Sequence, residues 1–247
     1  MGITVKNLCF TYHGSSKKVL DGVNLKIEDG DFIGVVGPTG SGKTTLLYCL
    51  NGLIPNSIKG KFYGEVLVDG VPTTSCKVSE LAKKVGIVFQ DPDWQLFSVT
   101  VKDEVAFGLK NLRMNRVEER VREALKTVGL EGFEDAEPYR LSQGQKQMLC
   151  IACVVAMQPK TILLDEPTSN LDYKNTKNVY GLLRRLNREE GKTIVVVEHD
   201  TDLLAEYAEK ILVINDGKIV KNGSKEEVFS DCRLLENLGI KIPRGWF

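Results

Sequence analysis

The sequence lacks any long hydrophobic run. Its longest apolar stretch, Met148 to Met157, falls well short of the roughly 20 residues that a bilayer-spanning helix needs. The N-terminal residues MGITVKNLCF also lack the basic start and long apolar segment of a secretory signal peptide. If the protein works at a membrane, we therefore expect it to act as a peripheral subunit on the cytoplasmic face of the cell membrane, held there by a partner.

The sequence also has no excess of charge of one sign. Lys plus Arg and Asp plus Glu number 33 each, so the formal net charge is zero. A general nucleic-acid-binding protein normally carries a basic excess, and we therefore expect no nucleic-acid partner, although a local basic patch is not ruled out by net charge. The length of 247 residues suits one large domain or two modest ones.

Cysteines are few, and they are scattered along the chain. A chain of this length does not need disulfide bonds to fold, so the six cysteines are expected to be reduced thiols. Cys150 and Cys153 form one C-x-x-C pair, but a zinc site would need a second pair or nearby histidines. Both lie in an apolar helical pattern, which predicts that they are small core residues.

Apolar periodicity predicts an α/β fold. Alternating or compact apolar runs indicate strands over 3–8, 23–27, 32–36, 65–68, 85–89, 161–164 and 193–197. Helical spacing or a helix-start pattern indicates helices over 43–53, 102–112, 117–128, 145–157, 175–189 and 201–207. This alternation is typical of a parallel sheet with helices on both faces.

Two regions depart from the alternation of strands and helices. Residues from about 91 to 157 are expected to form a mostly helical subdomain inserted into the α/β core. Residues 211–221 indicate a closing hairpin around Asp216-Gly217. The chain then reads as a short helix and a tail, with a loose end from Pro243 onward. We accordingly expect one domain over 2–235 and a C-terminal tail over 236–247.

A glycine-rich loop follows the third expected strand and matches the pattern G-x-x-x-x-G-K-[ST]. Its residues, with the threonine that follows, are Gly37, Pro38, Thr39, Gly40, Ser41, Gly42, Lys43, Thr44 and Thr45. Glycines let several backbone N–H groups point at one phosphate chain, and the following helix adds the positive end of its dipole. The lysine would reach the outer phosphates and Thr44 would bind Mg²⁺. A chance glycine-rich turn is the alternative, which the strand before and the helix after disfavour.

Two acids end the apolar run over 161–164. Carboxylates at the end of a buried strand are costly unless they face a cation or water. Asp165 is placed to hold Mg²⁺, and Glu166 to orient and deprotonate an attacking water. An ordinary acidic turn is the alternative, which the phosphate-loop motif upstream makes unattractive.

With these two motifs in place, the chain resembles the ABC ATPases. Residues 141–145, Leu-Ser-Gln-Gly-Gln, resemble the LSGGQ signature of that family. Gln90 resembles the Q-loop glutamine, residues 169–172 (Ser-Asn-Leu-Asp) the D-loop, His199 the switch histidine, and Tyr12 the aromatic residue that stacks on adenine. Taken singly, each has a structural explanation, but their common order along nearly the whole chain favours function.

The resemblance implies the fold and the roles of the residues. The fold would be a P-loop NTPase, with a RecA-like parallel-sheet core, an N-terminal antiparallel β subdomain and an inserted α-helical subdomain. Two such subunits would sandwich ATP head to tail and hydrolyse it. Residues of one subunit would face signature residues of the other: Lys43, Thr44, Gln90, Asp165, Glu166 and His199 opposite Ser142, Gly144 and Gln145. Mg²⁺ would be held by Thr44, Gln90 and Asp165.

The segment after Gln90 is similar to that of energy-coupling factor (ECF) transporter ATPases, the group that includes cobalt and nickel importer subunits. The resemblance implies a second ATPase subunit, a transmembrane coupling protein and a substrate-binding membrane protein, with vitamins or transition-metal ions as substrates. Trp94, Leu96 and Phe97 would line a docking groove for the coupling protein. The alternative is that they belong to the core of the helical subdomain.

The signature departs from the family pattern at Gln143, where the family has glycine, and at Met148, where a basic residue is common. Glycine often marks a close approach or an unusual backbone angle, so Gln143 would weaken the composite site that this signature completes on its partner. We hypothesise an ATPase heterodimer with unequal sites, although a homodimer stays open. Two other functions also stay open: a soluble ABC ATPase acting on DNA or ribosomes, and a regulatory ATP binder.

Overall fold

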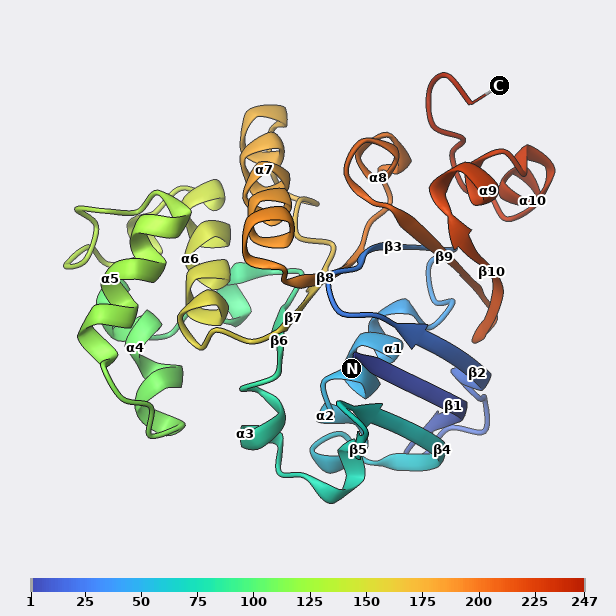
Figure 1. Cartoon of the computed structure of the whole chain (residues 1–247), viewed down its shortest axis with the longest axis horizontal. Coiled ribbons are helices and arrows are strands. Elements are labelled where there is room, and N and C mark those ends of the chain that lie inside the picture. Colours follow the sequence, from blue (N-terminus) through green and yellow to red (C-terminus); the bar gives the residue numbers. More distant parts are fainter. Residues whose placement is uncertain (1, 247) are drawn as a thin grey trace.

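The computed structural model describes residues 2–246, which form two sheets and a set of helices (Figure 1). The strands are β1 (Ile3–Tyr12), β2 (Leu20–Ile27), β3 (Phe32–Val36), β4 (Gly60–Val68), β5 (Val71–Pro72), β6 (Val85–Val88), β7 (Thr161–Asp165), β8 (Thr193–Val197), β9 (Lys210–Asn215) and β10 (Lys218–Ser224). The α-helices are α1 (Lys43–Leu50), α2 (Leu53–Asn56), α3 (Val78–Leu81), α4 (Val101–Asn111), α5 (Val117–Val128), α6 (Gln143–Ala156), α7 (Tyr173–Glu190), α8 (Thr201–Tyr207), α9 (Lys225–Phe229) and α10 (Cys232–Asn237). Short 3-10 turns cover Thr73–Ser75, Pro92–Trp94 and Pro138–Arg140.

The larger sheet has six strands in the order β10-β9-β3-β8-β7-β6. All neighbours pair in parallel except β9 and β10, which form the predicted hairpin around Asp216-Gly217. Because the carboxyl ends of parallel strands point the same way, the loops after β3, β6, β7 and β8 meet at one edge of this sheet. The predicted parallel-sheet core is confirmed.

Both faces of this sheet are buried, which explains the continuous apolar runs of its strands. In β7 all five residues are buried, and Ile162 and Leu164 join one core cluster while Leu163 joins the other. The first cluster continues into helices α4 to α9, and the second into α1 and the smaller sheet. The central sheet therefore connects all parts of the fold.

The smaller sheet is antiparallel, with the order β2-β1-β4-β5. Strand β1 extends beyond the predicted residues 3–8, and it changes register near Asn7, which has a positive φ of 47°. A bulge of this kind breaks the alternation of apolar residues on which strand prediction depends. The first half of β4 is mostly exposed and carries no apolar pattern. The predicted N-terminal antiparallel subdomain is nevertheless present.

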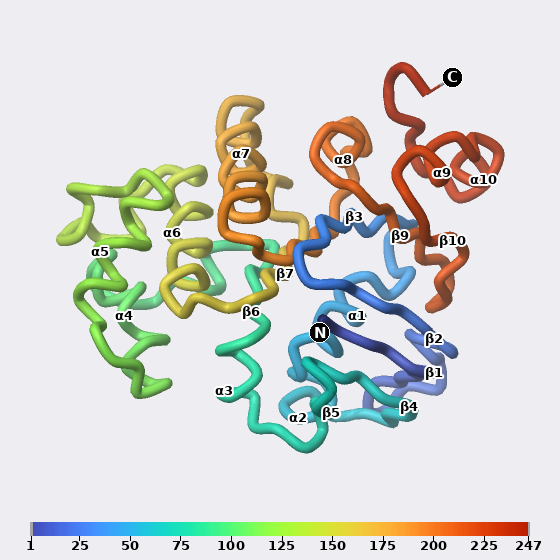
Figure 2. Tube along the Cα trace, in the orientation of Figure 1, coloured from blue at the N-terminus to red at the C-terminus, as the bar shows by residue number. Residues whose placement is uncertain are grey.

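Helices α4, α5 and α6 form a group at one end of the molecule, on the other side of α7 from the smaller sheet (Figure 2). The helix over 117–128 is predicted from the spacing of Val117, Val121, Leu125 and Val128, and α5 buries the last three of these together with Ala124, while Val117 is partly buried. Cys150 lies buried in α6 and Cys153 is partly buried against the same core. The burial of both thiols agrees with the prediction that they are small core residues.

The C-terminal segment packs against the core, and the expectation of a loose end from Pro243 onward is wrong for residues 243–246. The backbone N–H of Arg244 donates to Asp202 in α8 at 2.7 Å. The ring of Trp246 packs edge-on against Phe229, with centroids 5.6 Å apart. Because these contacts join residues that are distant in sequence, a local sequence pattern does not predict them.

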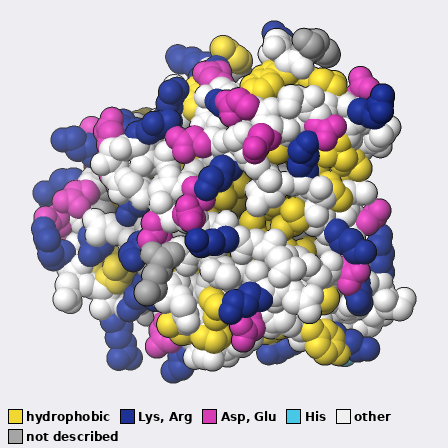
Figure 3. Space-filling model, turned by 45° about the vertical axis from the view of Figure 1, so that its right-hand side comes forward, with side chains coloured by type: hydrophobic (Ala, Val, Ile, Leu, Met, Phe, Trp, Pro, Cys, Tyr) yellow, Lys and Arg dark blue, Asp and Glu magenta, His cyan; other side chains and the backbone are white. Residues whose placement is uncertain are grey.

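Residues 2–246 show two features that concern possible partners, namely the apolar length of the helices and the distribution of charge. In residues 2–246, no helix is both long enough and apolar enough to cross a membrane. Acidic and basic side chains are interspersed over the face drawn in Figure 3. That face therefore shows the balance of charge that the composition predicts.

Candidate functional site

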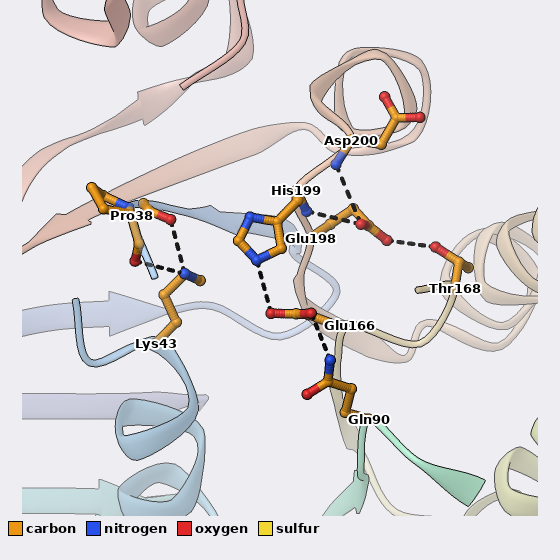
Figure 4. A network of polar contacts seen from close by, with 9 residues as sticks. Pro38, Lys43, Gln90, Glu166, Thr168, Glu198, His199 and Asp200 are labelled. Carbon is orange, nitrogen blue, oxygen red and sulfur yellow. Dashed lines mark hydrogen bonds and ion pairs between the residues drawn. The ribbon is translucent and has the colours of Figure 1, made fainter. Parts of the chain in front are cut away.

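The candidate site lies where four parallel strands end. The loop after β3 carries the glycine-rich segment, and the loop after β6 carries Gln90. Strand β7 ends at Asp165 and is followed by Glu166, and the loop after β8 carries His199. Since β3, β8, β7 and β6 are neighbours in the sheet, these residues gather at one edge, which is where open α/β sheets bind ligands. Figure 4 shows them converging from separate elements.

The glycine-rich loop curls tightly before α1. Gly42 has a φ of 106°, and a Cβ at this position would lie 2.7 Å from the carbonyl oxygen of Val19. A side chain does not fit there, so the glycine is required by space as well as by backbone angle. The loop thereby delivers the free N–H groups of the first turn of α1 to the edge of the sheet, where they form an anion-binding concavity.

Lys43 is buried inside this loop, with 6% of its surface exposed. Its ammonium donates to the carbonyl oxygens of Gly37 at 2.8 Å and Pro38 at 3.0 Å. Burial lowers the pKa of Lys43, against the opposing influence of the Glu166 and Asp165 carboxylates. The Ser41 hydroxyl is also buried and has no hydrogen-bond partner within residues 2–246. A buried cation and an unpaired hydroxyl in one loop fit a phosphate chain.

Asp165 ends β7 with only 4% of its surface exposed. Burial raises the pKa of its carboxyl, which a hydrogen bond from Thr44 and the charge of Lys43 oppose. Its Oδ1 atom is buried without a partner in the described part of the chain. An unpaired carboxylate oxygen beside a hydroxyl is a donor set that suits Mg²⁺, so Thr44 and Asp165 fit the predicted ion.

Glu166 lies between the two other predicted catalytic side chains. Its Oε2 accepts a hydrogen bond from Gln90 Nε2 at 2.9 Å, and its Oε1 lies 2.9 Å from His199 Nε2. Its φ of 47° is in the left-handed region, which is uncommon for non-glycine residues. The structure thus brings together three side chains that the sequence separates widely, and their catalytic roles stay a proposal.

Tyr12 stands beside the phosphate loop, at the end of β1. It is half-buried, packs edge-on against Phe10, and its hydroxyl lies 3.0 Å from Thr45 Oγ1 in α1. This bond ties the smaller sheet to the phosphate-loop helix. The stacking of Tyr12 on adenine stays a prediction.

The signature residues form the start of α6. Ser142 caps the helix and exchanges hydrogen bonds with Gln145, at 2.9 and 3.3 Å. A Cβ on Gly144 would lie 2.6 Å from Asn175, which follows the D-loop. Figure 1 places α6 well apart from α1. The signature and the phosphate loop of one chain therefore do not meet within that chain.

Gln143 occupies the first helical position of α6 and is exposed. No positive φ occurs there, so nothing in the fold of this chain requires a glycine at position 143. Its amide lies 3.5 Å from the Asp93 carboxylate, which also pairs with Lys146 at 2.6 Å. Of the two central signature positions, only Gly144 is closely packed within this chain, and Gln143 remains available to a partner.

Besides Asp165, the buried carboxylates include Glu104 and Glu198, which the sequence motifs do not identify. Glu104 in α4 accepts hydrogen bonds from the backbone N–H groups of Phe97 and Ser98. Glu198 follows β8 directly and is 5% exposed. The sequence does contain a pattern that could have identified Glu198, because it follows an apolar strand directly, as Asp165 follows the apolar run over 161–164. Glu104 gave no such signal, because an acid in the first turn of a helix is common.

The chain matches the model of the family described as ABC transporter over residues 20–169, which is more than half of its length. This chain belongs to the ABC transporter family. It is 49% identical over 98% of its length to a putative ABC transporter ATP-binding protein of Pyrococcus horikoshii, covering 86% of that protein. It is 44% identical to the energy-coupling factor transporter ATP-binding protein EcfA of Methanocaldococcus jannaschii, covering 98% of this chain and 86% of the relative.

A solved structure agrees with these relatives. The structure of cbiO1 from Clostridium perfringens, described as part of the ABC transporter complex cbiONQ, superposes with a TM-score of 0.82 at 33% identity. The match covers 99% of this chain and 96% of that one. The ABC ATPase fold is therefore confirmed, and so is the resemblance to the energy-coupling factor group.

Proposed function

We propose that this ABC family chain is the ATP-hydrolysing subunit of an ECF-type importer, which powers uptake of vitamins or transition-metal ions through separate membrane proteins. The observation that carries the proposal is Glu166, held between Gln90 and His199 beside the phosphate loop. The similarity to EcfA and to cbiO1 supports the ECF branch. The substrate itself would be selected by another polypeptide.

Hydrolysis follows from the roles that these side chains can fill. The loop N–H groups and Lys43 bind the phosphates of ATP and stabilise negative charge that develops on them. Thr44, Gln90 and Asp165 would hold Mg²⁺, which would supply further charge neutralisation. Glu166 accepts a proton from the attacking water as the water oxygen bonds to the γ-phosphorus and the bond from that phosphorus to the bridging oxygen breaks. Gln90 and His199 keep the carboxylate directed at the water.

A second ATPase subunit is needed to complete the site. Since α6 lies apart from α1 in one chain (Figure 1), Ser142, Gly144 and Gln145 can contribute only to the nucleotide site of another subunit. A head-to-tail pair meets this need with two shared sites. Because Gln143 is exposed, it would enter the site that this signature completes, which favours a heterodimer with unequal sites over a homodimer.

The segment after Gln90 offers a surface to the membrane coupling protein. Trp94 is 88% exposed and Phe97 65% exposed, while Leu96 packs against the core. Phe97 packs edge-on against Phe107, with centroids 4.7 Å apart, and Tyr139 is exposed nearby across a small hollow. Exposed aromatic side chains in one area are typical of interaction sites. This surface would hold the chain at the cytoplasmic face of the membrane.

Two other functions fit the structure less well. A soluble ABC ATPase that acts on DNA or ribosomes usually carries a long coiled-coil insertion, but α4, α5 and α6 are short helices packed on one another. A regulatory ATP binder would not need Glu166 and His199 in hydrogen-bond contact. The transport ATPase remains the proposal.

Co-purification from the native membrane tests the transport role. We expect the chain to be recovered with a second ABC subunit and an integral membrane protein, and a Trp94→Ala/Phe97→Ala variant to lose the membrane protein while still binding ATP. The exposed Tyr63 of β4 provides the matched control, Tyr63→Ala, which should keep all partners. Recovery with ribosomes or DNA, or without a membrane protein, would contradict the proposal.

A further inference from the structure

Glu198 is the residue immediately before His199, and its carboxylate is almost fully buried, with 5% of the residue exposed. No lysine, arginine or histidine side chain of residues 2–246 pairs with it, and its bonds come from neutral donors. Figure 4 shows three of these donors, in Thr168, His199 and Asp200. A buried carboxylate is costly unless its oxygens are fully hydrogen-bonded. The hydrogen bonds that Glu198 accepts are therefore needed to offset the cost of its burial.

The two carboxylate oxygens bind different elements. Oε1 accepts the backbone N–H groups of His199 at 2.8 Å and Asp200 at 3.3 Å, and so fixes the turn between β8 and α8. Oε2 accepts the hydroxyls of Thr168 at 2.6 Å and Tyr180 at 3.2 Å. Burial, and then the charge of Glu198, raises the pKa of the Tyr180 hydroxyl, so this group stays a donor.

These bonds link the segment that carries His199 to the segment that carries Glu166, the two residues in the candidate catalytic contact. His199 is one of the residues bound through Oε1, and Thr168, bound through Oε2, lies two residues after Glu166. The His199 ring is itself exposed and makes its contact with Glu166 at 2.9 Å. Since the ring is not enclosed by packing, its position depends on the backbone that carries it.

We propose that Glu198 is a positioning residue, whose buried carboxylate holds the turn at His199 and the loop after Glu166 in one network and so sets the contact between these two side chains. The inference rests on the proposed roles of Glu166 and His199 in hydrolysis. Glu198 itself does not touch the reacting atoms. It acts through the backbone N–H of His199 and through Thr168.

The test compares Glu198→Ala with Glu198→Gln in the complex recovered from membranes. The alanine variant should lower kcat by about tenfold or more, while KM for ATP stays within about twofold. This fall is smaller than the roughly 10²- to 10⁴-fold rate enhancement that a positioned acid–base group contributes, because Glu166 and His199 are both still present. Glutamine should rescue most of kcat, because its amide oxygen can accept both N–H groups and its NH₂ can donate to the hydroxyl oxygens.

A matched control separates positioning from loss of stability. Asn187 is buried at 7% exposure, and its amide donates to two backbone carbonyl oxygens at 2.8 Å, far from the site in sequence. Asn187→Ala should lower the melting temperature but leave kcat unchanged. If Asn187→Ala lowers kcat as much as Glu198→Ala, the positioning role is refuted.

Histidine NMR gives a second readout that does not need activity. The chain has only two histidines, so the ring signals of His13 and His199 can be assigned with His13→Ala. Glu198→Ala should move the His199 signals and leave those of His13 in place. If Glu198→Ala proves unstable, Thr168→Val must lower kcat severalfold and move the same signals, and unchanged signals with unchanged kcat would overturn the inference. His199→Ala with full activity would instead refute the proposed function of His199.

Discussion

Glu104 in α4 holds the backbone at Phe97 and Ser98, and its removal should destabilise the fold. The residue is 4% exposed, and its carboxylate accepts hydrogen bonds from the backbone N–H groups of Phe97 at 2.8 Å and Ser98 at 2.6 Å. A hydrogen bond to a charged group contributes about 1.5–3 kcal/mol. Because both bonds are only partly buried, the lower value applies to each, and Glu104→Ala should lower the free energy of unfolding by about 3 kcal/mol.

Thermal and urea unfolding measure this loss. For a chain of this size, about 3 kcal/mol corresponds to a fall in Tm of roughly 6–12 °C. Glu104→Gln should cost less, about 1 kcal/mol, because the amide oxygen can still accept both N–H groups. The matched control is Glu118→Ala, since Glu118 lies in the first turn of another helix, α5, but is exposed.

The same substitution should weaken docking. Since Glu104 fixes the backbone of Phe97, its loss should reduce recovery of the membrane coupling protein and leave ATP binding unchanged. The reasoning is refuted if Glu104→Ala unfolds within about 0.5 kcal/mol of the unaltered protein, the range of an ordinary surface change, or if it loses no more stability than Glu118→Ala.

Three further predictions concern the nucleotide site and the docking surface. Burial raises the pKa of Asp165, so its charged form lowers the stability of the folded protein at pH values above that raised pKa. Asp165→Asn should therefore raise the Tm of the nucleotide-free protein at neutral pH, with a gain that shrinks as the pH falls through the raised pKa. Equal Tm values at every pH would contradict this. Gln143→Gly should increase ATPase activity at the site that this signature completes. The heterodimer hypothesis fails if the chain alone is a fully active homodimer and the substitution changes nothing. Trp94→Ala should reduce transport with little change in Tm, because its side chain is exposed, and a large fall in Tm would show that Trp94 belongs to the core.

Much of the site could be predicted from sequence because its motifs are local. The phosphate loop needs a strand, a glycine-rich turn and a helix in direct succession, and the carboxylate pair needs only the end of β7. By contrast, the contact of Glu166 with Gln90 and His199 depends on the order of strands in the sheet, and it was expected only through the resemblance to a family.

What sequence reasoning missed depends on contacts between distant residues. Glu198 reads as a strand-end acid, and only the fold reveals that Thr168 and Tyr180 meet it. The C-terminal segment reads as a loose end because its docking requires Asp202, far back in the chain. The docking-groove hypothesis treated Trp94 and Leu96 alike, whereas the structure exposes the first and packs the second against the core.

The central claim is that Glu166 is the base of ATP hydrolysis, and Glu166→Gln tests it most directly. The matched control is Glu131→Gln, at an exposed loop position. In the complex recovered from membranes, Glu166→Gln should lower ATPase activity by about 100-fold or more while the Kd for ATP stays within about threefold, and the control should keep full activity. An account based on Glu166 would be contradicted if the variant retained half of the activity.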